Sequence, residues 1–126
     1  MLKETVSTIH APAAIGPYHQ AVIYDQLVFC SGQIGLHPET GEMVGQDTAA
    51  QMKQVMKNLG VVLKASGSDW DKVLKCTIYL ADMTDFAGVN EIYAEYFPAD
   101  PPAREAVAVK TLPKNARVEV SCIAHR

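Results

Sequence analysis

Residues 47–67, DTAAQMKQVMKNLGVVLKASG, and the run KVLKCTIYL at residues 72–80 decide the fold class of this chain. The first stretch repeats its apolar side chains at helical spacing, at Met52, Val55, Met56, Leu59, Val62 and Leu63. This spacing predicts an amphipathic helix over residues 47–66. Asp47 or a near neighbour can cap its start, and Gly67 can close its end in a left-handed turn.

The second run alternates with a period of two and therefore predicts a strand. Leu74, Cys76, Ile78 and Leu80 would face one way, and Lys75, Thr77 and Tyr79 the other. Before this pair, we expect a weak strand in KETVS and two strands in AVIYDQLVFCSGQIG that turn at Asp25–Gln26. After it, we expect a helix over about 84–96 that Pro98 stops, and two strands over about 105–110 and 117–124. The order β-β-β-α-β-α-β-β predicts an α+β fold, a mixed sheet with two helices packed on one face.

The length and the net charge of the chain limit the classes of protein to which it can belong. A chain of 126 residues is expected to form a single domain, residues 1–126. The net charge of −3 provides no basic footprint for nucleic acid, so we expect no nucleic-acid partner. No segment approaches the roughly 18 apolar residues of a membrane span, and the first residues contain no apolar signal core. We therefore expect a cytoplasmic protein with no membrane partner.

The cysteines and histidines are scattered along the chain. Cys30, Cys76 and Cys122 each lie inside an apolar run, without a CxxC pair, which indicates buried strand thiols and neither a disulfide framework nor a zinc site. The histidines, at positions 10, 19, 37 and 125, form no pair on a helix face. We expect no metal.

Two helices can cover only one face of the predicted sheet. The other face would carry Thr77, Tyr79, Glu119 and Ser121 beside Val107 and Val109. A face of this mixed character is either solvated or packed against another subunit, and cyclic symmetry is a common way to close it. We expect an oligomer, with any site on that face lying between chains.

Arg104 follows a proline-rich approach, FPADPPAR at residues 97–104. Proline restricts the residue before it to extended geometry, so residues 99–103 should form a stiff, non-helical segment that places Arg104 at the start of a strand. From the residues alone, two interpretations stay open: a solvated strand-end charge, or a site for a planar carboxylate, which a guanidinium binds bidentately.

Four stretches together resemble one known family: APAAIGPYHQAV, SGQIGLHPETGE, VLKCTIYLADMTDFAGVNEIYAEYF and PPAREAVAVKTLPKNARVEVSCIA. They are similar to the RidA (YjgF-like) family of enamine/imine deaminases, over about residues 11–124. The resemblance implies a chorismate-mutase-like fold in a homotrimeric barrel, with three sites between subunits. It also implies hydrolysis of 2-aminoacrylate, 2-iminopropanoate and related acids released by pyridoxal-phosphate enzymes. The products are 2-oxo acids and ammonia, and no cofactor is needed.

The resemblance assigns roles to particular residues. Arg104 would bind the substrate carboxylate, Glu119 would hold or deprotonate the attacking water, and Tyr18 would line the pocket with its ring and reach the substrate with its hydroxyl. Further substrate contacts would come from Ser31, Gly32 and the backbone around Ala106. Structural alternatives remain for two of these residues, since Glu119 can pair with an arginine and Tyr18 can pack in the core. Asn90 is interpreted as structural.

Three positions depart from the commonest family pattern. His19 stands where a small residue is frequent and could be merely exposed, or could narrow the pocket. Glu105 stands where serine usually follows the arginine, and strand alternation should point it away from the face of Arg104, toward a subunit interface. Ala106 replaces a cysteine, which excludes a thiol nucleophile there.

Two other functions remain open from the sequence. Some relatives have been described as translation-inhibiting endoribonucleases, although the acidic balance and the absence of a basic stripe argue against RNA cleavage here. The other alternative is a trimer that binds a small 2-oxo acid, or acts as a chaperone-like scaffold, without catalysis. Arg104 would serve binding and catalysis equally, so turnover is the property that separates the two.

Overall fold

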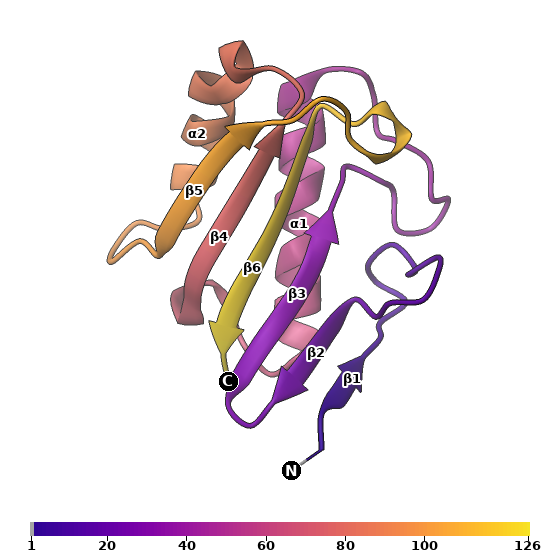
Figure 1. The fold of residues 1–126 in the computed structure, drawn as a ribbon, viewed down its shortest axis with the longest axis vertical. Helices are drawn as coiled ribbons and strands as arrows, with labels where there is room; N and C mark the ends of the chain where they lie inside the picture. Colours follow the sequence, from indigo (N-terminus) through magenta and orange to yellow (C-terminus); the bar gives the residue numbers. More distant parts are fainter. Residues whose placement is uncertain (1) are drawn as a thin grey trace.

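The long helix and the strand that follows it form as predicted. The strand is part of a six-stranded sheet, and the helix is one of two that pack on this sheet (Figure 1). The structure, a computed structural model, describes residues 2–126. The strands are β1 (Glu4–Val6), β2 (Ala21–Tyr24), β3 (Leu27–Gln33), β4 (Val73–Leu80), β5 (Ala103–Ala108) and β6 (Val118–His125), and the helices are α1 (Thr48–Ala65) and α2 (Phe86–Ala94). The predicted order of elements and the α+β class are confirmed.

The sheet has the strand order β1-β2-β3-β6-β4-β5. Neighbouring strands are antiparallel except β4 and β5, which are parallel because α2 carries the chain back between them. Both helices lie behind the sheet in Figure 1. We call the side they cover the helix face and the other side the open face. The prediction of a mixed sheet with both helices on one face is therefore confirmed.

Helix α1 begins and ends where its caps were predicted. The Asp47 carboxylate accepts a hydrogen bond from the Ala50 backbone N–H at 3.2 Å, and Gly67 adopts a positive φ of 79° just beyond the last turn. The apolar stripe packs on the helix face of the sheet, and its six predicted members are all fully buried. Local capping and apolar spacing agree here, which explains why the sequence defined this element so closely.

Strand β4 departs from the predicted alternation at its first residues. Leu74 was expected to share the buried face with Cys76, but its side chain is 46% exposed and Val73 is buried instead. The pairing with β6 shifts register between Val73 and Lys75, which marks a β-bulge. A bulge inserts one extra residue into the strand, so the residues before it change sides. Leu74 is therefore a corrected prediction, while Cys76, Ile78 and Leu80 are buried as expected.

The second predicted helix divides into a 3-10 turn, Met83–Asp85, and helix α2. Its predicted stripe packs against the core: Val89, Ile92 and Tyr93 are buried, and Phe86 and Tyr96 are half-buried. The proline-rich segment that follows is not helical, as predicted, but it is not extended throughout, because Asp100 before Pro101 has a positive φ of 49°. Strand β5 begins at Ala103, earlier than the expected residue 105. Arg104 is thus the second residue of β5, at the start of the strand, as predicted.

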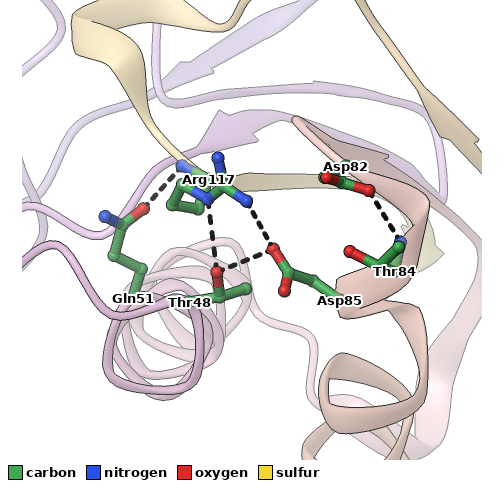
Figure 2. Close-up of polar contacts among 6 residues, drawn as sticks. All are labelled: Thr48, Gln51, Asp82, Thr84, Asp85 and Arg117. Carbon is green, nitrogen blue, oxygen red and sulfur yellow. Dashed lines mark hydrogen bonds and ion pairs between the residues drawn. The ribbon is translucent and has the colours of Figure 1, made fainter.

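A polar cluster ties the start of β6 to the starts of both helices (Figure 2). Arg117 forms an ion pair with Asp85 at 2.8 Å, and Thr48 donates a hydrogen bond to the same carboxylate at 3.0 Å. The Arg117 backbone N–H donates to the Gln51 side chain at 2.7 Å. Charge-assisted bonds of this kind are the stronger class of hydrogen bond, so the cluster holds the chain firmly two residues before Glu119.

The three thiols form a row on the helix face across β3, β6 and β4. Cys122 lies opposite Cys30 on one side and opposite Cys76 on the other, and all three are buried. Burial raises the pKa of Cys76 to about 11. The prediction of buried strand thiols is confirmed.

Candidate active site

A cavity of about 540 Å³ lies beside β3 and β6, under the segment that leads into β2. We call it the β3–β6 cavity. Its polar wall is formed by Tyr18, Ser31, Gly32, Lys114 and Glu119. Its apolar wall includes Pro12, Ala13, Ile15, Ile34, Leu36 and Pro113. Small-molecule sites usually combine an apolar lining with a few placed polar groups, and this cavity has that character.

Glu119 is a half-buried carboxylate on the open face of β6. Its neighbours Val118 and Val120 are fully buried on the helix face, and Tyr79 of β4 lies opposite it. Burial raises the pKa of the Glu119 carboxyl above its ordinary value, because the charged form loses hydration. A carboxylate with a raised pKa at a cavity wall can accept a proton from a water molecule near neutral pH.

Gly32 explains how the Glu119 side chain fits against β3. A Cβ built on Gly32 would overlap the Glu119 carboxylate. Gly32 does not have a positive φ, so the glycine is required for space and not for backbone conformation. The sequence suggested that Gly32 permits a close approach, and in the folded chain the group that approaches is Glu119.

The segment that carries Tyr18 is held by a single buried side chain, Gln20. The Gln20 amide N–H group donates to the backbone oxygens of Thr8, Ala11 and Pro12 at 3.1, 3.3 and 2.8 Å. Its oxygen accepts from the Thr8 backbone N–H at 2.6 Å. This segment is therefore fixed without regular secondary structure. Tyr18 is 50% exposed at the cavity, which contradicts the alternative that it packs in the core.

Ser31 and His19 are joined through the backbone. The Ser31 hydroxyl donates its proton to the His19 carbonyl oxygen at 2.6 Å. The Ser31 hydroxyl oxygen can therefore still accept a hydrogen bond from a ligand. The His19 side chain is exposed, and His19 does not belong to the wall of the β3–β6 cavity described above. Within residues 2–126, His19 thus contributes its backbone and does not narrow the cavity.

Arg104 lies on the helix face and not at the cavity. It pairs in register with Cys76, and its guanidinium donates to Asn90 Oδ1 at 2.6 Å. The guanidinium carbon lies 5.3 Å from the Phe86 ring centroid and 5.0 Å from that of Tyr93, within cation–π range. No carboxylate of residues 2–126 comes within 4.0 Å of it, so the strand-end charge is not neutralised by a neighbouring acid.

The sheet therefore separates Arg104 from Glu119 within one chain. Glu105 points to the open face, where it forms an ion pair with Lys75 at 2.7 Å, and this confirms the predicted alternation with Arg104. Ala106 faces the helix side like Arg104, lies opposite Ile78, and packs against the core away from the cavity. The cavity unites Tyr18, Ser31, Gly32 and Glu119, while Arg104 and Ala106 lie elsewhere.

Asn90 is the residue whose role the sequence did not reveal. It was interpreted as structural, but its amide contacts the guanidinium of Arg104 directly. The available signal was a polar side chain next to the apolar stripe of the second helix. Its partner depended on how β5 packs against α2, which a single sequence does not show.

The rest of the described chain adds no metal cluster and no membrane helix. Across residues 2–126, the structure holds no group of three or more His, Cys, Asp or Glu side chains placed for a metal ion. Neither helix in that range has the length and apolar character needed to cross a membrane.

A mixed six-stranded sheet with two helices behind it and a cavity beside β3 and β6 defines a class of small α+β proteins. The family model described as endoribonuclease L-PSP matches residues 8–126. The chain belongs to this family, which is the RidA (YjgF-like) family that its motifs resemble.

Three relatives show how close the similarity is. Reactive Intermediate Deaminase A, chloroplastic, of Arabidopsis thaliana is 57% identical over 122 residues, which are 97% of this chain and 65% of that protein. The 2-iminobutanoate/2-iminopropanoate deaminase of Homo sapiens is 47% identical over 124 residues, 98% of this chain and 90% of that one. The crystal structure of E. coli TdcF with bound serine matches with a TM-score of 0.92 at 37% identity, over 98% of each chain. This chain thus spans just under two thirds of the Arabidopsis protein and most of the other two.

Proposed function

We propose that the protein hydrolyses 2-imino acids and their enamine tautomers, such as 2-iminopropanoate and 2-aminoacrylate, to 2-oxo acids and ammonia. The observation that carries this proposal is the half-buried Glu119 carboxylate, with its raised pKa, on the wall of the β3–β6 cavity. The names of the Arabidopsis and human relatives support the same chemistry. For the compartment, the cytoplasm remains our prediction, and the Arabidopsis relative is named as chloroplastic.

A complete site requires a second copy of the chain. Arg104 lies near one edge of the sheet on the helix face, whereas Glu119 lies on the open face, so one chain cannot bring both to one small substrate. We propose that they meet across the interface of a homotrimer. Exposed apolar side chains on the open face support this, because a solvated face would leave Tyr24, Leu27, Phe29 and Val107 in water.

In the proposed reaction, Arg104 of one chain binds the substrate carboxylate through its free guanidinium N–H groups. The enamine CH2=C(NH2)–COO⁻ takes a proton at its CH2 carbon and becomes an iminium whose central carbon is electrophilic. Glu119 of the neighbouring chain removes a proton from a water molecule as the water oxygen bonds to that carbon, and the C=N electron pair moves to nitrogen. The protonated Glu119 then gives its proton to the nitrogen. As the C–N bond breaks and ammonia leaves, the hydroxyl group returns a proton to Glu119 and its oxygen becomes the carbonyl oxygen of the 2-oxo acid.

The remaining predicted contacts would orient the substrate. Tyr18 and Gly32 would wall the site, and the Ser31 oxygen can accept a hydrogen bond from the iminium N–H. Since β5 is an edge strand within the described sheet, backbone groups on its outer side, around Ala106, are free to bond a ligand. Positioning and exclusion of competing nucleophiles would supply most of the rate gain, because free enamines already hydrolyse in water.

The direct test generates 2-aminoacrylate with a serine dehydratase and follows pyruvate release with and without the protein. We expect the wild type to accelerate release, and Arg104→Ala to lose about tenfold to a hundredfold of that acceleration, through the missing charge-assisted contact. Arg104→Lys should remain poor because an ammonium cannot form the bidentate fork. Glu119→Gln should slow turnover and still bind a 2-oxo acid.

Pyruvate release at the uncatalysed rate in the presence of the wild type would overturn the proposed hydrolysis, and unchanged turnover in Arg104→Ala, at a melting temperature equal to the wild type, would overturn the role given to Arg104. A second candidate function, binding of a small amino or oxo acid without turnover, has one observation on the binding side, the serine bound in the structure of E. coli TdcF. The same assay separates the two functions, because a pure binding protein would leave pyruvate release at the uncatalysed rate while still binding pyruvate.

A further inference from the structure

Within residues 2–126, Arg104 is the arginine that has no carboxylate within 4.0 Å. The chain has three arginines. Arg117 pairs with Asp85 at 2.8 Å and Arg126 approaches Glu4 at 3.6 Å. Arg104 has instead an amide oxygen and two aromatic faces around it, all neutral. Its positive charge is therefore still available to an anion.

The three neutral partners come from one helix. Phe86, Asn90 and Tyr93 lie four and three residues apart on α2, the spacing that places side chains on one helix face. The helix itself is fixed, because Tyr93 is buried against the sheet and Asp85, just before the first turn, is held by Arg117. A rigid face of α2 thus lies against the guanidinium of an exposed strand-end arginine.

We propose that Asn90 is a positioning residue that, with the rings of Phe86 and Tyr93, holds Arg104 as a preorganised receptor for the carboxylate of the substrate. The inference rests on the proposed function, since it deepens the role given there to Arg104. An arginine side chain loses much rotamer entropy when it is immobilised, and contacts made before the ligand arrives reduce the loss that occurs on binding. The hydrogen bond to Asn90 uses one of the five guanidinium N–H donors and leaves the others for a ligand.

The neutrality of residue 90 is part of the proposal. An aspartate there would accept the same hydrogen bond with nearly the same shape, but its negative charge would neutralise Arg104 and compete with the substrate carboxylate. Asparagine orients the guanidinium without that competition. The contrast with Arg117, which is compensated by Asp85 and has a structural role, shows both arrangements within one molecule.

The test compares Asn90→Asp and Asn90→Ala with Glu91→Gln, a control at the adjacent, exposed position of α2. KM and kcat are measured with imine generated in situ, and pyruvate binding is measured by calorimetry. We expect Asn90→Ala to raise KM and weaken pyruvate binding roughly five- to tenfold with kcat changed little, because one hydrogen bond that orients the arginine is lost. Asn90→Asp should weaken both by at least about tenfold, because a new carboxylate occupies the guanidinium. Glu91→Gln should match the wild type.

A purely structural role for Asn90 would lower the melting temperature and kcat of both variants in parallel, without a selective effect on KM or pyruvate binding, and that result overturns the inference. So would Asn90→Asp binding pyruvate as tightly as the wild type. Side-chain NMR of the Arg104 Nε–H group gives a readout free of substrate, and it should report greater mobility in Asn90→Ala. The proposed function fails separately, when the wild type does not accelerate pyruvate release.

Discussion

Gly32 on β3 and Glu119 on β6 fit together so closely that the Glu119 carboxylate occupies the space that a side chain at residue 32 would need. The carboxylate can take its observed position only because residue 32 has no side chain. Because Glu119 is also flanked by two buried valines in its own strand, its backbone is held in place while its side chain lies against Gly32.

Replacing Gly32 with alanine should displace the carboxylate and slow imine hydrolysis. A shift on the order of 1 Å in a reacting group can reduce rate about a hundredfold, so we expect a loss between about tenfold and a hundredfold in kcat/KM. The control is Gly88→Ala in α2, where a Cβ meets nothing within 4 Å. That variant should keep its activity and gain roughly 0.5–1 kcal/mol in the free energy of unfolding. Full activity in Gly32→Ala would show that the position of Glu119 does not matter.

The raised pKa of Glu119 gives a stability change with a defined sign. A carboxyl whose pKa is higher in the folded chain holds its proton to higher pH, so it lowers stability as pH rises from its ordinary pKa to the raised value. Glu119→Gln should therefore be more stable than the wild type at pH 7, and the difference should disappear near pH 4. Thermal unfolding of both proteins between pH 4 and pH 8 measures this, and a difference that grows toward acid pH contradicts it.

The cluster in Figure 2 should behave as a coupled unit. Removing Asp85 with alanine leaves Arg117 without its ion-pair partner, and we expect a loss of about 1.5–3 kcal/mol in the free energy of unfolding. Thr48→Val alone should have a smaller effect, and the double variant should lose less than the sum, since Thr48 and Arg117 share one carboxylate oxygen. Urea denaturation of the four proteins gives the coupling energy. Strict additivity would mean that the three residues act independently.

The row of thiols should be chemically silent in the native protein. With a pKa of about 11, only about one in ten thousand Cys76 side chains is ionised at pH 7, and the thiolate is the reactive form. Labelling with an aromatic disulfide reagent should therefore follow global unfolding, and a variant with alanine or valine at all three positions should be less stable but active. Rapid labelling of one cysteine in folded protein, or lost turnover in the folded triple variant, would indicate a missed functional thiol.

The parts of the fold that the sequence defined are those where local signals agree. Helix α1 has its cap at Asp47, its closing glycine and its apolar stripe in one continuous stretch, and all three were predicted. Leu74 was predicted wrongly because a bulge depends on how two distant strands pair, which alternation within one strand does not report. The absence of helix before Arg104 was predictable because proline cannot continue a helix, but Asp100, the residue before Pro101, has a positive φ of 49° and not the extended geometry expected there.

The candidate site was predictable only in part. The residues assigned to it were found from motifs, and four of them lie together at one cavity. The contact between Arg104 and Asn90 was not predictable, because it depends on the packing of β5 against α2. The separation of Arg104 from Glu119 likewise depends on strand order and register, and these set which face of the sheet each side chain occupies.

That separation has a genetic consequence. In the proposed trimer each chain gives its arginine to one neighbour and its glutamate to the other, so two impaired alleles can rescue each other. In a trimer that contains both Arg104→Ala and Glu119→Gln chains, one interface joins an intact arginine to an intact glutamate. Random mixing of equal amounts would then restore about a quarter of the sites to full function, although every site of either parent trimer is impaired. A site contained within one chain would give no such complementation.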